Sequence, residues 1–269
     1  MEITNKKAGL LLSTDVLGGY GLDIIFDLAK SAGFDGIDLC MRKNFDARNA
    51  KYVKKLTGKY DIPVRCIQVS EHVTKTEMNQ ALDLCEVTGA KVLTINAPSY
   101  FSFGSYNFLV DNLASYQSHN ADISFAIINP DDTSFFGLPL PKYRFRNIVE
   151  IIKKYKTNVG LNLSQINPDY LEGELLKKME KFLPNIPVVY LADKGKLGAP
   201  YLLPGEGILK LPKILKKIKE QMYDGWISIK IVIDKHALTD LDKTLLILKK
   251  CVAYYQEHYE KVEVIPLVK

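Results

Sequence analysis

Residues 186–207 decide the fold, and they read Ile186-Pro-Val-Val-Tyr-Leu-Ala-Asp-Lys-Gly-Lys-Leu-Gly-Ala-Pro-Tyr-Leu-Leu-Pro-Gly-Glu-Gly207. An apolar run ends at Leu191, an irregular polar stretch follows, and Pro-Gly-Glu-Gly leads into the periodic segment 208–221. This order predicts a buried strand, a loop and a helix. Polar residues just past such strands build the functional sites of α/β proteins, so Asp193 and Lys196 are candidate pocket residues.

The same alternation runs through the 269 residues. Apolar runs predict strands at residues 8–12, 36–40, 64–69, 92–96, 123–129, 159–163, 186–191 and 226–233. Amphipathic segments such as 22–32 and 81–88 lie between them, and a last helix is predicted over 240–259. Eight such units indicate a single-domain α/β fold, a closed (β/α)8 TIM barrel. Gly33 and Gly89 fit left-handed helix ends before the second and fourth strands.

Composition narrows the function classes. With 47% hydrophobic and 25% charged residues, the chain is typical of a globular protein. It has no apolar stretch of about 20 residues and no signal-peptide pattern, so we expect a cytoplasmic protein without a membrane partner. The net charge of +5 is spread over helix-like segments, which argues against a nucleic-acid partner. The four cysteines lack metal-site spacing.

Two predicted loops are rich in aromatic residues. Residues 98–106 include Tyr100, Phe101 and Phe103, and residues 131–143 include Phe135 and Phe136. Both would emerge on the active face of a barrel. They fit either a packing surface, including a homodimer interface, or a lid over a ligand.

Four motifs in order resemble the xylose isomerase-like TIM barrel superfamily: Ala32-Gly-Phe-Asp-Gly-Ile-Asp-Leu39, Gly89-Ala-Lys-Val-Leu93, Leu203-Pro-Gly-Glu-Gly207 and Tyr223-Asp-Gly-Trp-Ile-Ser-Ile-Lys230. That superfamily includes sugar and sugar-phosphate isomerases and epimerases, and apurinic endonucleases. The resemblance implies carbohydrate metabolism, with a polyol, sugar or sugar phosphate as the small-molecule partner.

Members of that superfamily typically hold a divalent metal with Glu, Asp, His and Glu at the ends of strands five to eight. The matching positions in this chain are Ile128, Ser164, Tyr190 and Lys230. Isoleucine offers no donor atom, and a lysine cation would repel the ion. We therefore expect a degenerate site with no metal cofactor.

The candidate catalytic residues are Lys230, Tyr190 and His72. Lys230 is either an ammonium paired with Asp38, Glu71 or Glu206, or an anion anchor, or an amine of lowered pKa. A cation beside Tyr190 would favour its phenolate. His72 either contacts substrate or faces solvent.

Nine further polar residues lie past predicted strands, and we expect them to bind substrate. They are Asp38, Gln68, Asn96, Asn129, Ser164, Asn167, Asp193, Lys196 and Glu206.

Three hypotheses follow. The first is a sugar or sugar-phosphate isomerase/epimerase-like protein with a polyol pocket and metal-free or lost catalysis. The second is a non-catalytic barrel that senses a small molecule. The third, an endonuclease-like repair enzyme, conflicts with the missing metal ligands.

Overall fold

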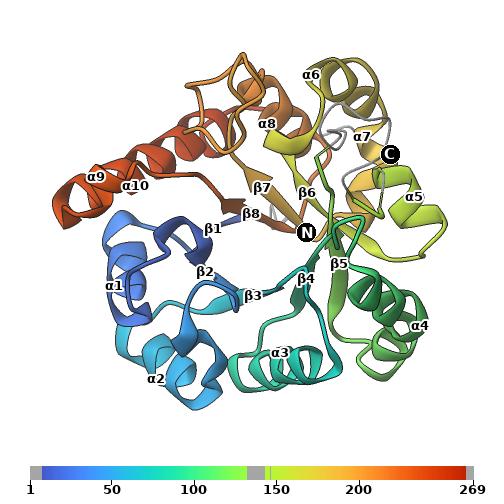
Figure 1. Ribbon diagram of the computed structural model, residues 1–269. Coiled ribbons are helices and arrows are strands. Elements are labelled where there is room, and N and C mark those ends of the chain that lie inside the picture. The colour runs from blue at the N-terminus through green and yellow to red at the C-terminus, as the bar shows by residue number, and fades with distance from the viewer. Residues whose placement is uncertain (1–7, 132–142, 146, 265–269) are drawn as a thin grey trace, which may run out of the picture.

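The computed structural model describes residues 8–131, 143–145 and 147–264. Eight parallel strands close into a barrel in chain order, with β1 pairing with β8. Figure 1 looks down this barrel, with the helices forming an outer ring. The strands are β1 (Gly9–Ser13), β2 (Gly36–Cys40), β3 (Val64–Val69), β4 (Val92–Asn96), β5 (Ser124–Ile128), β6 (Asn158–Asn162), β7 (Val188–Leu191) and β8 (Trp226–Ile229). The predicted single-domain TIM barrel is confirmed.

The predicted bounds of β2, β3 and β4 are the observed ones. The prediction for the last strand was too long, because β8 ends at Ile229. Beyond it, the backbone N–H of Val232 donates to the carbonyl of Tyr201 in the loop after β7, 2.8 Å away, and not to a barrel strand. An apolar run alone does not show where the backbone stops pairing with the neighbouring strand and begins to pair with a loop.

The longer helices are α1 (Leu22–Ala32), α2 (Ala50–Tyr60), α3 (Lys75–Thr88), α4 (Phe103–His119), α5 (Ile148–Lys153), α8 (Leu211–Glu220) and α10 (Leu241–Tyr255). Short turns include the 3-10 helix η1 (Thr14–Leu17), α6 (Pro168–Tyr170), α7 (Met179–Phe182) and α9 (Lys235–Leu238). Gly33 and Gly89 have φ of 94° and 76°, so both predicted left-handed helix ends are confirmed. In the described part of the chain, no helix is both long and apolar enough to cross a bilayer.

The barrel interior is filled by side chains at alternate strand positions. Leu11, Cys66, Val92, Ile128, Val188 and Tyr190 form an apolar cluster separate from the one between strands and helices. Gly160 makes room for the Tyr190 ring, because a Cβ at this glycine would lie 3.1 Å from Tyr190 Cε2. Towards the carboxyl ends of the strands, the buried residues become polar: Asp38, Gln68, Thr94 and Ser228.

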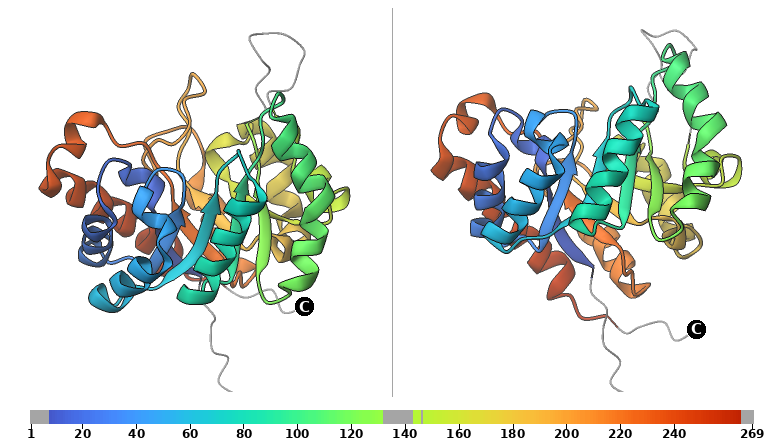
Figure 2. Two further views of the ribbon diagram at one scale, coloured as in Figure 1. Left: turned by 60° about the horizontal axis from the view of Figure 1, so that its bottom comes forward. Right: turned by 90° about the horizontal axis from the view of Figure 1, so that it is seen from below.

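The aromatic segment 98–106 is partly helical, because α4 begins at Phe103. The Arg144 guanidinium carbon lies 4.5 Å from the ring centroid of Tyr100 and 4.2 Å from that of Phe103. Figure 2 shows this end of α4 and the β7–α8 loop rising on the same side of the barrel. Phe135 and Phe136 of the second predicted loop lie outside the described residues.

Candidate functional site

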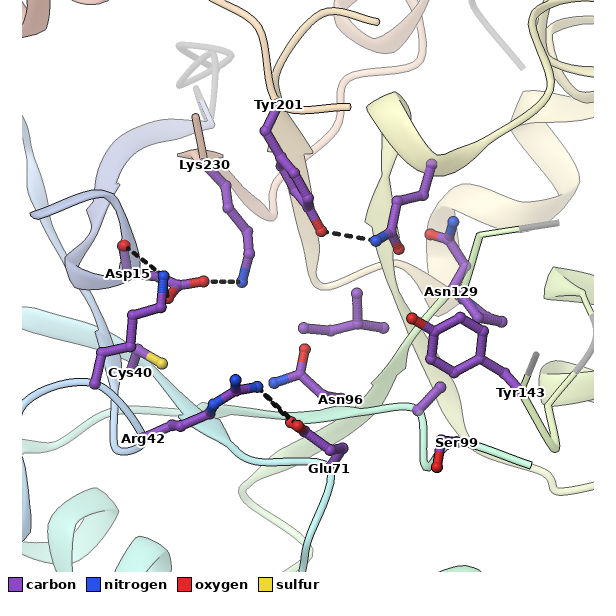
Figure 3. Close-up of a pocket in the computed structure, with 15 residues that line it drawn as sticks. Asp15, Cys40, Arg42, Glu71, Asn96, Ser99, Asn129, Tyr143, Tyr201 and Lys230 are labelled. Carbon is purple, nitrogen blue, oxygen red and sulfur yellow. Dashed lines mark hydrogen bonds and ion pairs between the residues drawn. The ribbon is translucent and has the colours of Figure 1, made fainter. Parts of the chain in front are cut away.

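A cavity of about 330 Å³ opens at the carboxyl ends of the strands. Its lining is mostly polar, and the labelled side chains in Figure 3 come from the ends of β1 to β5 and from the loops after β5, β7 and β8. This is the end of a TIM barrel at which loops carry function.

Lys230 lies at one side of this cavity and is 6% exposed. Its ammonium nitrogen is 3.2 Å from Asp15 Oδ2, and it donates to Gln68 Oε1. The other oxygen of Asp15 lies 2.8 Å from the Lys43 ammonium nitrogen. One carboxylate thus bridges two lysines (Figure 3).

The groups in this cluster lower the pKa of Asp15 and raise the pKa of Lys230. Burial is the largest single influence on Lys230 and would lower its pKa, but Asp15 together with Cys40, Tyr201 and Asp38 outweighs it and raises the pKa. Burial would raise the pKa of Asp15, but Lys230 and Lys43 outweigh it and lower the pKa. The predicted amine of lowered pKa is therefore wrong. Among the described residues, the ion-pair partner of Lys230 is Asp15, and not the predicted Asp38, Glu71 or Glu206.

A second ion pair lies across the cavity. Arg42 Nη1 is 2.8 Å from both carboxylate oxygens of Glu71. Arg42, Lys43 and Lys230 are opposed by Asp15 and Glu71, so the described lining carries one positive charge more than negative ones. Such a lining favours a ligand with a negative or electron-rich oxygen.

Amide and hydroxyl groups line the remaining wall. The hydroxyl of Tyr201 accepts from Gln165 Nε2 at 2.7 Å and from Asn162 Nδ2 at 3.1 Å. Asn96 and Asn129, both predicted to bind substrate, also line the cavity. Asn129 is held by the end of β6, because its Oδ1 accepts from the Asn162 N–H at 2.6 Å.

Tyr190 lies below the cavity and is fully buried. Its hydroxyl is 2.9 Å from Thr94 Oγ1, and the Lys230 nitrogen lies 5.1 Å from its ring centroid. Burial raises the pKa of Tyr190 well above its ordinary value, so the predicted phenolate is wrong. Tyr190 packs the barrel interior against Gly160.

Asp38 and Gln68 form a buried layer beneath Lys230. Asp38 Oδ2 accepts from Ser228 Oγ at 2.9 Å and from Gln68 Nε2 at 3.3 Å. Burial raises the pKa of Asp38 to about 6, although Lys230 and these hydrogen bonds act the other way. Both residues support Lys230 and do not line the cavity.

Asp193 stabilises its own loop. The carboxylate accepts backbone N–H groups from Lys194 at 2.8 Å, Leu209 at 3.0 Å and Gly205 at 3.1 Å. It is fully buried and is not in the cavity lining. Ser164 is also buried below the surface, where its hydroxyl donates to Asn162 Oδ1 at 3.0 Å.

Four other predicted site residues lie outside the cavity. The His72 side chain is 74% exposed and its Nε2 is 3.8 Å from Glu71 Oε1. Asn167 caps α6 by accepting from the Asp169 N–H at 2.9 Å, and it lines a separate hollow with Lys196. Glu206 borders another hollow, beside α10.

Sequence reasoning missed Asp15, Lys43, Tyr201 and Cys40 in the cavity lining. Asp15 lies two residues past β1, so the rule that polar residues after strands build the site could have found it. Tyr201 has a φ of 66° in a long loop, and no local sequence signal places its ring.

The four positions at which the superfamily holds metal do not fit a divalent ion. Ile128 has no donor atom, the Ser164 hydroxyl is used by Asn162, and Tyr190 is a buried neutral phenol. Lys230 places a cation where a ligand would be needed. In the described ranges, no three His, Cys, Asp or Glu side chains gather as an ion site.

Comparison with known proteins agrees with this fold. The model of the xylose isomerase-like TIM barrel family matches residues 26–251. No curated protein sequence matches the chain. A solved structure of 3-keto-D-glucoside 4-epimerase from E. coli is 14% identical with a TM-score of 0.67, covering 91% of this chain and 99% of that one.

Two further solved structures are similar over most of their length. L-ribulose 3-epimerase is 12% identical with a TM-score of 0.66, covering 94% of this chain and 95% of that one. A D-tagatose 3-epimerase-like protein is 17% identical with a TM-score of 0.65, covering 93% and 98%. At such identities these structures show the shared fold. With the family model matching most of its length, this chain belongs to the xylose isomerase-like TIM barrel family.

Proposed function

We propose that this chain binds a sugar or sugar phosphate at the barrel mouth and acts on it as an isomerase/epimerase-like protein without a divalent metal. The observation that carries the proposal is the Lys230 ammonium, held at the cavity wall between Asp15 and Gln68. It supplies a fixed positive charge at the mouth of a barrel whose family positions do not fit an ion.

The polar lining suits a polyhydroxylated ligand. Tyr201 and Asn96 present hydroxyl and amide groups, and the Arg42–Glu71 pair, which lies next to Asn96 in Figure 3, offers a donor and an acceptor. A cavity of about 330 Å³ is in the range of small-molecule sites. We therefore expect ligand hydroxyls to bind these groups and a carbonyl or acidic oxygen to bind Lys230.

Isomerisation or epimerisation next to a carbonyl needs a base and a group that stabilises the developing oxyanion. Lys230 has the charge for the second task. Asp15 is the carboxylate nearest to it in the cavity lining, and its pKa is lowered by Lys230 and Lys43 against the effect of burial. A carboxylate of lowered pKa is a weak base, so we expect slow proton transfer.

This weakness favours a second candidate, a binding barrel without catalysis. The pKa of Asp15 is lowered and that of Lys230 raised, so each moves away from neutral pH. General acid–base groups work best with pKa values near the operating pH. The same cavity would then serve as a sensor for a small polyol or acid.

The test is a panel of aldoses, ketoses and their phosphates, with binding measured by calorimetry and by thermal shift. Each ligand is tested with EDTA and with added Mn²⁺ or Mg²⁺. Binding that is unchanged by EDTA supports the metal-free site, and binding that requires the ion overturns it. Failure of the whole panel to bind at millimolar concentration would overturn the proposal itself.

Catalysis is tested separately, by incubating bound ligands in D₂O and following the hydrogens next to the carbonyl by NMR. Deuterium incorporation at these carbons supports proton transfer by the protein. Binding without incorporation supports the sensor.

A further inference from the structure

A second cavity of about 560 Å³ adjoins the first at the barrel mouth. Asp15, Lys43, Tyr201 and Lys230 line both cavities. The second cavity extends from these residues over η1 and the segment between β8 and α9, at the edge of the barrel where α9 lies in Figure 1. A ligand held by Lys230 in the first cavity can therefore continue into the second.

The two cavities differ in chemistry. Beyond the shared residues, the walls of the second are mainly aliphatic side chains: Val16, Ile231, Val232, Ile233 and Leu238. Ile231 and Ile233 are buried, whereas Val232 is 65% exposed. Val232 and Lys230 nevertheless line this cavity together.

The backbone fixes Val232 in this place. Its N–H donates to the carbonyl of Tyr201 at 2.8 Å, which joins the segment after β8 to the β7–α8 loop. The exposed valine therefore lies on a segment whose backbone is fixed, next to Lys230 in the cavity wall.

We propose that the ligand is a polyol that carries an apolar substituent, such as a glycoside with an aryl or alkyl aglycone. Its hydroxyls would bind in the first cavity and its apolar group would cover the aliphatic wall around Val232. This inference rests on the proposed sugar-binding function. Removing the valine side chain and an aromatic ring from water together supplies the affinity gain.

A phosphate in the second cavity is the competing occupant. Lys43, Lys230 and Lys235 are lysines of this lining, but Lys43 and Lys230 are already paired with Asp15, at 2.8 Å and 3.2 Å. A phosphate would also have to leave water beside Ile231, Val232 and Leu238, which offer no hydrogen bonds from their side chains. The apolar substituent fits this wall better.

The experiment compares matched ligands on the full chain. Methyl and phenyl glycosides of glucose, galactose, mannose and xylose, together with the corresponding sugar phosphates, are titrated by calorimetry. We expect the phenyl glycoside of the preferred sugar to bind at least about tenfold more tightly than its methyl glycoside. In the variant Val232→Asp, the phenyl-to-methyl affinity ratio should fall at least about fivefold.

Val110→Asp is the matched control, because Val110 is also an exposed valine, 47% accessible, but on α4 and outside both cavities. It should leave the affinity ratio unchanged. Equal affinity for methyl and phenyl glycosides would overturn the inference and leave the sugar site standing. Sugar phosphates that bind more tightly than phenyl glycosides and lose that advantage in Lys235→Ala would also overturn it. No binding by any of these ligands would overturn both proposals.

Discussion

Asp193 and Lys230 both follow the ends of neighbouring strands, and both are buried, but they are stabilised in different ways. Asp193 accepts three backbone N–H groups from its own loop. The Lys230 ammonium contacts side chains from other parts of the barrel, Asp15 after β1 and Gln68 on β3, and it lines the cavity.

The difference distinguishes a charge that stabilises the fold, that of Asp193, from one that can bind a ligand, that of Lys230. Backbone amides of a folded loop cannot turn away, so the Asp193 carboxylate is committed to shaping the β7–α8 connection. Side-chain partners can re-form around a ligand oxygen, so the Lys230 charge remains available. Proximity to a strand end alone does not distinguish the two cases.

The largest expected effect is on stability, in Asp193→Ala. The substitution leaves three backbone donors without their acceptor, and we expect the free energy of unfolding to fall by about 4 kcal/mol. Urea denaturation measures this loss. Asp27→Ala, at an exposed site on α1, is the control and should change it by less than about 0.5 kcal/mol.

Gly207→Ala should act in the same direction, because its Cβ would lie 2.3 Å from Asp193 Oδ1. If Asp193→Ala left stability intact and abolished ligand binding, Asp193 would be a ligand-binding residue like Lys230 and not a stabiliser of its loop.

Asp38 sharpens the comparison, because it is a buried carboxylate whose hydrogen-bond donors are the side chains of Ser228 and Gln68. Its pKa of about 6 lies above the ordinary 3.8. The folded chain therefore holds this proton more tightly than the unfolded chain. The stability that it contributes is fully present below about pH 4 and is lost as the pH rises through 6.

Asp38→Asn cannot ionise, so its free energy of unfolding should fall less between pH 4 and 7 than that of the wild type. The expected difference is up to about 3 kcal/mol, from a shift of about two pKa units. Asp15, Lys230, Tyr190 and Cys66 also interact with Asp38, but they are present in both proteins. Urea denaturation at the two pH values measures the difference, and parallel losses would contradict the prediction.

Lys230→Met should give the opposite result to Asp193→Ala. The affinity for a panel sugar should fall at least about tenfold, because a charged hydrogen bond to the ligand is lost. Stability should change by less than about 2 kcal/mol, since Asp15 keeps Lys43 and methionine fills the space. Calorimetry and urea denaturation measure the two effects.

Lys213→Met, on the exposed side of α8, is the matched control. Unchanged affinity in Lys230→Met would remove Lys230 from the proposed binding site.

The strands were predictable because each is a short apolar run, and Gly33 and Gly89 mark helix ends for a local steric reason. The pairing of Lys230 with Asp15 depends on barrel closure, which places Leu12 beside Ile229 in register. Residues from opposite ends of the chain meet there, and no local sequence pattern predicts this contact. The predicted barrel is enough to expect that residues after β1 and β8 lie close together, but it does not identify Asp15 as the partner of Lys230.

The burial of Tyr190 and Asp193 could not be predicted for a different reason. Tyr190 fits the barrel interior because Gly160 on β6 lacks a side chain, and Asp193 fits its loop because Gly207 lacks one. Both are contacts between side chains and distant backbone. Sequence reasoning correctly placed both residues near the end of β7, but it expected both to line the pocket. Tyr190 instead packs the barrel interior, and Asp193 binds the N–H groups of its own loop.

The smallest expected effect belongs to His72→Ala. The His72 ring is exposed, and its backbone N–H donates to Ser70 Oγ at 3.2 Å, a bond that alanine retains. We expect stability to change by less than about 0.5 kcal/mol and ligand affinity by less than about twofold. Urea denaturation and calorimetry on the panel sugar measure both. A tenfold loss of affinity would mean that the loop after β3 closes over the cavity when ligand binds, which would make His72 a ligand contact that the ligand-free arrangement does not form.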